Sequence, residues 1–325
     1  MQVKGLLKSS AFMMSLALVV ALLTNFSGVF PSDVLTSDVR SNITVFVLAL
    51  MMTLSLSRIP MSNLNPITNW KSVLRAVTLG LVVSSLIPLA GYYLLKGTDF
   101  SNEAMGLVFI AATPFAASVA PLTYIQNGDM EHAARGTIIV YILSLVWIPF
   151  IIWLTLGEVV DMTSVVITVF EIIGIPLIVS RFLTKVKIGK DFMAIFLNCC
   201  IFLLVWLSVS STRFPSDVGI LVAFLVVAAL RSFFLGNLVE VTEKRMGIHW
   251  KQRVPDILMT SYKNKGIAIA MCVATLGPLA GSAMVAIATS IVVEIMWVAF
   301  MDSVLFNKKR MARELAAEEA EAQKS

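Results

Sequence analysis

The stretch Asp256-Ile-Leu-Met-Thr-Ser-Tyr-Lys-Asn-Lys-Gly266 carries two lysines, Lys263 and Lys265, and continues directly into an apolar run over 267–276. An uncompensated ammonium group at the centre of a bilayer costs about 3 kcal/mol on membrane-insertion scales. The asparagine between the lysines and the glycine after them also weaken a helix at this point. The stretch therefore predicts a polar site inside a membrane protein.

The composition places the whole chain in the same class. Of its 325 residues, 58% are apolar and only 14% are charged, whereas a soluble domain has about 25% charged residues. The apolar runs have the length of about 20 residues that a membrane-spanning helix needs, not the alternating segments of about 10 residues typical of outer-membrane barrels. The predicted fold is an all-α polytopic membrane protein whose surroundings are a lipid bilayer, and no nucleic-acid partner is expected.

Ten apolar segments are long enough to cross a bilayer. They cover about 11–30, 41–58, 72–95, 104–127, 134–156, 162–183, 192–210, 217–239, 254–276 and 279–306. The first resembles a secretory signal but lacks a clear cleavage site, so we expect it to remain as a helix. With the N-terminus inside, 20 of the 25 Lys and Arg residues fall on the cytoplasmic side, and only Arg40, Lys96 and Arg213 fall outside. This distribution predicts a multi-pass protein of the cell membrane with both termini in the cytoplasm.

Ten helices divide into two halves of five, and an odd number per half gives the halves opposite orientations. We therefore expect a first inverted repeat over 1–157 (helices 1–5) and a second over 158–306 (helices 6–10). A short internal sequence similarity supports the division, because Ser144-Leu-Val-Trp-Ile-Pro-Phe150 in the fifth span corresponds to Glu294-Ile-Met-Trp-Val-Ala-Phe300 in the tenth. Residues 307–325 form a charged cytoplasmic tail, interpreted as a short solvated helix or a disordered end.

The fourth span of each half carries a predicted break. In 104–127, Pro114 and Pro121 each remove a backbone donor and disfavour helix at the preceding residue. In 254–276 the break falls around 262–266. Paired interruptions at matching positions of inverted repeats mark the binding site of a secondary transporter, although two ordinary kinked helices packed by their neighbours would give the same pattern.

Both breaks resemble the crossover segments of the bile acid:sodium symporter family, to which the arsenite-efflux permeases are related. The stretch from Pro114 to Asp129 is similar to the first crossover, a proline followed by small residues, then Thr-Tyr and a closing glycine. The stretch from Thr260 to Gly266 resembles the second, Glu-x-x-x-Gln-Asn-x-Gly-x-Ala. The resemblance implies ten helices arranged as a panel and a core, with helices 4 and 9 broken and crossing in the core. It also implies transport of a small organic anion by alternating access.

The sequence departs from this family at the positions that bind sodium in its sodium-coupled members. The replacements are Val119 and Ala120 after the first break, Met259 and Lys263 at the second, and Val83 in the third span. Of the usual oxygen ligands only Thr137 and Asn264 remain. We therefore hypothesise that the ammonium group of Lys263 or Lys265 substitutes for bound sodium, and that transport is coupled to a proton or to no ion.

The arsenite permeases suggest an alternative function, an efflux permease or channel for a small neutral or metalloid solute such as arsenite. These relatives carry a cysteine directly after the first-break proline, where this chain has Phe115. Glu294 in the last span fits both branches of the resemblance. Measurement of solute flux would separate the two functions.

The candidate pathway residues cluster at the two breaks and in the helices expected beside them. They are Pro114, Ser118, Pro121, Thr123, Thr137, Thr260, Ser261, Lys263, Asn264, Lys265 and Glu294. Glu294 and Glu171 are the acids expected in mid-span, and we expect Glu294 to pair with a lysine of the second break. The hydroxyl groups either contact the substrate or repair the broken backbone.

The sequence offers little for other functions. A dyad of Ser261 with Lys263 or Lys265 is formally possible, but no span contains histidine or an aspartate pair, so we expect no enzyme activity. The three cysteines lack metal-binding spacing, and we expect neither a metal nor a cofactor. The expected partners are a small, anionic substrate and the bilayer.

Overall fold

The structure, a computed structural model, describes residues 6–59, 69–186 and 188–322. Regular structure in those ranges is helical, apart from an isolated antiparallel backbone bridge between Phe115 and Lys263. Seven helical stretches of the described chain are long and apolar enough to cross a membrane, and two shorter apolar helices accompany them. The chain is therefore an all-helical, multi-pass membrane protein, as its composition predicts.

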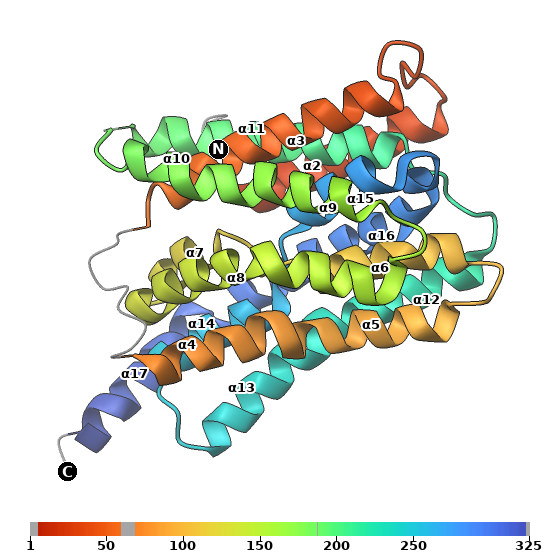
Figure 1. Cartoon of the computed structure of the whole chain (residues 1–325). Helices are drawn as coiled ribbons and strands as arrows, with labels where there is room; N and C mark the ends of the chain where they lie inside the picture. The colour runs from red at the N-terminus through yellow and green to blue at the C-terminus, as the bar shows by residue number, and fades with distance from the viewer. Residues whose placement is uncertain (1–5, 60–68, 187, 323–325) are drawn as a thin grey trace.

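One group of helices, which we call the panel, fills the upper part of Figure 1. It consists of α2 (Ser10–Phe26), α3 (Ser37–Leu56), α9 (Met162–Val169), the π-helical turn η2 (Phe170–Gly174), α10 (Ile175–Leu183) and α11 (Lys190–Ser210). Helix α11 packs along α2 and α3, and α10 packs along α3. The panel therefore joins two helices from each half of the chain.

The second group, which we call the core, lies below the panel in Figure 1, apart from α15, which is drawn beside α9. Its first part is α4 (Trp70–Val77), η1 (Thr78–Val83), α5 (Ser84–Leu95), α6 (Ser101–Ala112), α7 (Val119–Ile125) and α8 (Met130–Leu156). Its second part is α12 (Val218–Ala229), η3 (Leu230–Phe234), α13 (Leu235–Arg245), α14 (Trp250–Ser261), α15 (Lys265–Leu276), η4 (Gly277–Leu279), α16 (Ala280–Phe300) and η5 (Met301–Leu305). The parts interlock, because α6 packs on α16 and α7 packs on α14.

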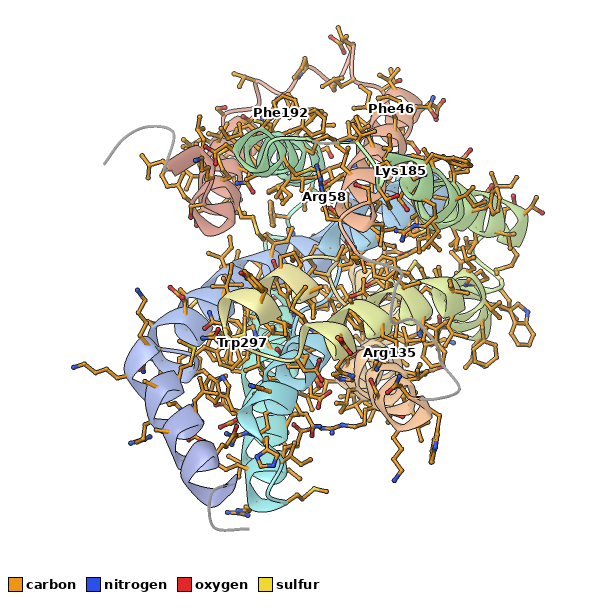
Figure 2. All side chains as sticks on the ribbon, turned by 90° about the vertical axis from the view of Figure 1, so that its left-hand side faces the viewer. Phe46, Arg58, Arg135, Lys185, Phe192 and Trp297 are labelled. Atoms are coloured by element: carbon orange, nitrogen blue, oxygen red, sulfur yellow. The ribbon has the colours of Figure 1, made fainter. Side chains whose placement is uncertain are left out.

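The panel and the core meet mainly through α15, which contacts α3 and α9. Viewed along the helices, the two groups remain distinct, with Arg58, Lys185 and Phe192 on the panel and Arg135 and Trp297 on the core (Figure 2). The α7–α8, α10–α11 and α13–α14 connections face the viewer there. We call this side the basic end, and the opposite side, with the α2–α3, α11–α12 and α15–α16 connections, the basic-poor end.

The predicted spans and the helices agree within a few residues except where helices break. The span predicted over 104–127 is divided into α6 and α7, and the span predicted over 254–276 is divided into α14 and α15. Segments 113–118 and 262–264 are the non-helical links, as the prolines and the second predicted break indicate. The count of ten spans, the inverted repeat and the boundaries at 157 and 306 stay predictions.

Four π-helical turns were not predicted from the sequence. Two of them, η1 and η3, interrupt the helices that run from α4 to α5 and from α12 to α13. A π-helical turn shifts the following side chains around the helix and leaves carbonyl groups without their usual partners, and such turns are frequent at functional sites. Both of these turns lie beside the breaks.

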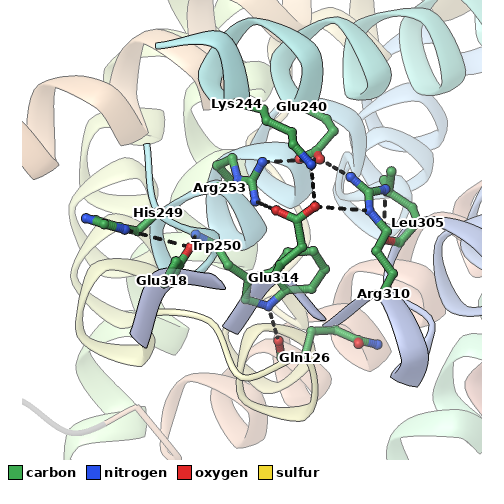
Figure 3. A network of polar contacts seen from close by, with 10 residues as sticks. All are labelled: Gln126, Glu240, Lys244, His249, Trp250, Arg253, Leu305, Arg310, Glu314 and Glu318. Atoms are coloured by element: carbon green, nitrogen blue, oxygen red, sulfur yellow. Dashed lines mark hydrogen bonds and ion pairs between the residues drawn. The ribbon is translucent and has the colours of Figure 1, made fainter. Parts of the chain in front are cut away.

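The packing of the described part of 307–325 against the core was not anticipated from the sequence. Helix α17 (Lys308–Ala322) packs on the basic end of the core, with Met311 and Leu315 against apolar residues there. Glu314 accepts hydrogen bonds from Lys244 and from Arg253, the latter at 2.6 Å (Figure 3). The tail is bound because charges in the α13–α14 region complement those on one face of α17.

Candidate functional site

The two breaks lie against each other and satisfy each other's backbone. Ala116 N donates to Tyr262 O at 2.9 Å, and Asn264 N donates to Pro114 O at 2.9 Å. These bonds form the bridge between Phe115 and Lys263. Irregular backbone at membrane depth requires such internal partners because no water is present there. The breaks therefore form one crossover that joins α6, α7, α14 and α15.

Asn264 fixes the start of α15 within this crossover. Its Oδ1 accepts from Ile267 N at 3.1 Å, which makes it the N-cap of the helix. Its Nδ2 donates to the Tyr141 hydroxyl at 2.8 Å, and that hydroxyl donates to Phe115 O at 2.9 Å. A single asparagine thus ties the second break to α8 and, through it, to the first break.

Lys263 points into a cage of oxygen atoms. Its side chain is fully buried, with the residue 1% exposed. The Nζ atom lies 2.6 Å from Thr113 O, 3.1 Å from Ala111 O, 3.3 Å from Ser85 Oγ and 3.4 Å from Gly80 O. No acidic side chain forms an ion pair with Lys263 among the described residues, so neutral oxygens alone surround its ammonium group.

The cage depends on the local sequence of η1 and of the first break. Gly80 lies in the π-helical turn, and a Cβ atom there would come within 2.5 Å of the Phe115 ring. Its carbonyl oxygen accepts from both Ser84 Oγ and Lys263 Nζ. Helix α6 ends at Ala112, which leaves the last carbonyl groups of that helix free to face the lysine. The cage is therefore made of a π-helical turn and a helix C-terminus.

Lys265 lies in a second cluster, with Glu294 and Arg231. Its Nζ is 3.3 Å from Glu294 Oε2, and the other carboxylate oxygen is 3.6 Å from Arg231 Nη2. Glu294 is 0% exposed, Arg231 1% and Lys265 7%. The expected pairing of Glu294 with a lysine of the second break is therefore present, but a second, unexpected cation shares the carboxylate.

The geometry of this cluster is loose. Lys265 Nζ and both oxygens of Glu294 are buried without a partner in hydrogen-bonding geometry. Arg231, by contrast, donates to Ser261 O at 2.8 Å and to Ser232 Oγ at 2.7 Å. Buried polar groups in a folded protein are normally hydrogen-bonded. Because Lys265 Nζ and the Glu294 oxygens lack hydrogen-bond partners, a proton, a water molecule or a ligand group can bind in this cluster.

Most of the predicted hydroxyl groups repair the backbone of their own helices. Thr123, Thr137 and Thr260 each donate to the carbonyl oxygen four residues earlier, at 2.7–2.8 Å. Ser261 also donates in this way, and its Oγ accepts from Trp297 Nε1 at 2.9 Å. Their oxygen atoms remain potential acceptors, but their protons are used within the protein.

The remaining predicted residues lie at the start of α7. Ser118 is exposed and is the residue that directly precedes α7. Pro121 is exposed in the first turn of α7, where a proline breaks no helical hydrogen bond. Pro114 is buried and contributes the carbonyl that Asn264 N contacts. The structure thus brings Pro114 and Ser118 to the crossover and leaves Pro121 on the outside of α7.

Arg231 was missed by the sequence analysis, which placed it on the cytoplasmic side. It lies in η3, in the interior of the core, and it contacts the same acid as Lys265. The sequence does indicate that Arg231 is buried, because apolar runs precede and follow the Arg231-Ser232 pair within the span predicted over 217–239. Glu171, the other acid expected in mid-span, is exposed on the panel and does not contribute to the site.

The basic end holds another polar cluster, which the sequence analysis also missed. Asp256, fully buried in the middle of α14, pairs with Arg75 and lies 2.9 Å from His132 Nε2. His132 Nδ1 is in turn 2.5 Å from Ser72 Oγ. The cluster connects α4, α8 and α14 beside a cavity of about 570 Å³ that Lys71 also lines.

An all-helical membrane protein with buried charges where two broken helices meet has the architecture of a secondary transporter. Comparison with known families agrees, since residues 45–237 match the Sodium Bile acid symporter family. The chain belongs to that family of membrane transporters. The matched region contains the first break and Arg231, whereas Lys263, Lys265 and Glu294 lie beyond it. A comparison with curated proteins gives no match.

Proposed function

We propose that this protein is a secondary transporter that moves a small organic anion across the cell membrane by alternating access, with the Lys263 ammonium group in place of bound sodium. The observation that carries the proposal is the oxygen cage of Lys263. Three carbonyl groups and one hydroxyl group lie within 3.4 Å of a single nitrogen. Carbonyl and hydroxyl oxygens are ligands suited to hard cations.

A tethered cation changes the energetics of transport. A sodium ion binds and leaves, so its gradient can drive a cycle, whereas the ammonium group of Lys263 stays on the protein in every step. Transport is then independent of sodium. A coupling ion, if there is one, is a proton, and the loosely bonded Lys265 and Glu294 are the groups that would carry it.

The charge at the crossover supports an anionic substrate. In their charged forms, Lys263, Lys265 and Arg231 carry three positive charges and Glu294 carries one negative charge. Two uncompensated positive charges in the membrane interior are costly unless an anion neutralises them. The N-termini of α7 and α15 point toward the same breaks and add favourable potential for an anion.

Alternating access requires the substrate to pass between two bodies that move relative to each other. The panel and the core are the natural candidates, because the main contacts between them run through three core helices, α8, α15 and α16. Arsenite efflux, the alternative, is less favoured because a fully buried phenylalanine, Phe115, stands where a thiol would be needed.

The test is flux into proteoliposomes that contain the purified protein. Radiolabelled benzoate and arsenite are compared with an inward gradient of sodium or of potassium. We expect benzoate flux at equal rates in both salts, a loss of at least tenfold in Lys263→Gln, and a smaller loss in Lys265→Ala. Lys96→Gln is the matched control, because it makes the same change at an exposed lysine remote from the crossover.

Two results would contradict the proposal. Sodium-stimulated flux that survives both Lys263→Gln and Lys265→Ala would show that neither lysine replaces the ion. Flux of arsenite without flux of benzoate would establish the alternative function.

A further inference from the structure

A second cavity, of about 550 Å³, opens at the basic-poor end between the panel and the core. Its panel side is formed by the α2–α3 connection, the start of α3 and the residues that follow α11. Its core side is formed by the end of α15, η4 and the start of α16. Arg213 N donates to Gly281 O at 3.1 Å, so the two sides are in direct contact here.

Two arginines line this cavity although its end of the molecule is poor in basic residues. The sequence places only Arg40, Lys96 and Arg213 at this end, and the fold brings Arg40 and Arg213 to one cavity. Their guanidinium groups repel each other. Lys96 is held elsewhere, over the rings of Tyr92 and Tyr93. Arg213 is exposed and Arg40, which lies over the Phe30 ring, is half-buried, so an anion bound between them would offset their mutual repulsion.

The guanidinium groups have no acidic partner in the described part of the chain. No ion pair within 4.0 Å joins Arg40 or Arg213 to a carboxylate, and Arg40 Nε is buried without an acceptor. Asp38 lines the same cavity but forms no ion pair with either arginine. A buried donor without an acceptor costs about 1–3 kcal/mol. The cavity therefore contains a cationic group that lacks its counterpart.

The rest of the lining suits a ligand with an apolar body. Phe30, Leu35, Val273 and Met284 line the cavity along with the hydroxyl groups of Ser32 and Thr36. A guanidinium group presents a planar fork that matches a carboxylate or a sulfonate in a bidentate contact. The two arginines and these walls together fit an organic oxyanion better than a bare halide.

We propose that this cavity is an oxyanion-binding site, separate from the crossover, in which Arg40 and Arg213 hold the carboxylate or sulfonate group of the cargo. The claim that the bound oxyanion is the transported cargo rests on the proposed function, whereas the existence of the binding site does not rest on it. Arg40 and Arg213 both lie on the panel side, and Arg213 N is bonded to Gly281 O of the core, so an oxyanion held by the two arginines lies where the panel and the core touch. The site therefore selects anions at the basic-poor end on the way to or from Lys263 and Lys265.

The test is the binding of benzoate to the purified full-length protein in an uncharged detergent, measured by titration calorimetry. Benzamide, of similar shape but neutral, is the ligand control. We expect benzoate to bind more tightly than benzamide and its dissociation constant to rise about tenfold or more in Arg40→Gln and in Arg213→Gln. Arg213→Lys should retain part of the affinity. Asp38→Asn should bind severalfold more tightly, because it removes the only negative charge that lines the cavity.

The Lys263→Gln variant distinguishes binding at this cavity from binding at the crossover. We expect the variant protein to bind benzoate at the cavity with unchanged affinity. Unchanged affinity in both arginine variants, or equal binding of benzoate and benzamide, would overturn the inference. Asp38→Asn is the control for misfolding, because a misfolded protein would not bind benzoate more tightly.

If vesicles show no benzoate flux while arginine-dependent binding persists, the proposed function is wrong and the binding site is retained. If benzoate flux keeps its wild-type KM in both arginine variants, the cavity does not bind the cargo during transport, and the proposed function is retained.

Discussion

At the scale of single residues, the ammonium group of Lys263 both stabilises the crossover and occupies a potential cation site. Four oxygen atoms face it. Gly80 O and Ala111 O keep Ser84 Oγ and Ser85 Oγ as donors, so Thr113 O is the cage carbonyl left without a donor among the described residues if the charge is removed. A buried acceptor left without a donor costs about 1–3 kcal/mol. The same four oxygens can also bind a metal cation once the lysine is gone. We therefore expect a metal cation to bind in the cage when Lys263 is replaced by a neutral residue.

We expect Lys263→Gln to lower the midpoint of thermal unfolding in detergent and to regain part of the loss in sodium chloride but not in choline chloride. The wild type should unfold at the same temperature in both salts, because its ammonium group already fills the cage. Lys96→Gln should behave as the wild type does. A Lys263→Gln protein with wild-type stability in both salts would contradict the role of the cage.

The cluster of Arg231, Lys265 and Glu294 predicts an asymmetric response to substitution. Glu294→Gln leaves two buried cations without an acid, and removal of one partner from a buried pair costs about 3–5 kcal/mol. Lys265→Met leaves Arg231 and Glu294 as a neutral pair and should cost less. We expect the unfolding midpoint to fall clearly further in Glu294→Gln than in Lys265→Met. Equal losses would mean that Arg231 does not share the carboxylate.

At the scale of helices, α6 and α16 approach each other closely enough to require glycine. A Cβ atom on Gly106 would lie 2.0 Å from Ala283 O, a backbone atom that cannot rotate away. Overpacking of this kind costs about 1–3 kcal/mol. We expect Gly106→Ala to lower the unfolding midpoint and Gly189→Ala, which has open space around it, to leave it within error. Similar midpoints for both variants would show that the helices separate easily.

Much of the helical pattern could be predicted from the sequence, for physical reasons that particular residues illustrate. Long apolar runs define membrane helices without reference to their neighbours, and Pro114 marks a break because it lacks an amide donor. Lys263 and Lys265 indicate an interior site because their burial is costly. The family resemblance stated from the two breaks agrees with the match over 45–237.

The parts that could not be predicted depend on contacts between distant segments. The pairing of Phe115 with Lys263 is a tertiary contact that no local pattern encodes. Arg231 was counted with the cytoplasmic basic residues, whereas the structure buries it in a π-helical turn inside the core. The gathering of Arg40 and Arg213 likewise requires the α2–α3 connection to meet the end of α11.

At the scale of the whole molecule, the C-terminal helix connects two helices of the basic end, α13 and α14. Glu314 of α17 is bonded to Lys244 of α13 and Arg253 of α14, and Arg310 pairs with Glu240 (Figure 3). Burial raises the pKa of Glu314, but the hydrogen bonds from Lys244 and Arg253 outweigh it and hold the pKa below its usual value of 4.5. The bound position of α17 is therefore coupled to pH.

A carboxyl group with a lowered pKa in the folded state stabilises that state above its unfolded pKa and loses the effect as the pH falls through the folded value. We expect α17 to stay bound at neutral pH and to be released as the pH falls below about 4.5. Amide hydrogen exchange of 308–322 measures the release. Glu314→Gln should show fast exchange already at pH 7, whereas Arg313→Gln, an exposed neighbour, should not. Slow exchange in Glu314→Gln at pH 7 would mean that apolar contacts alone hold the helix.

The oxygen cage has a consequence for biosynthesis. Thr113 and Gly80 precede Lys263 by 150 and 183 residues in the chain, so the ribosome delivers these acceptors to the translocon long before the lysine. Until the lysine arrives, Thr113 O lacks this donor, so the crossover forms only after the segment that carries Lys263 has been inserted.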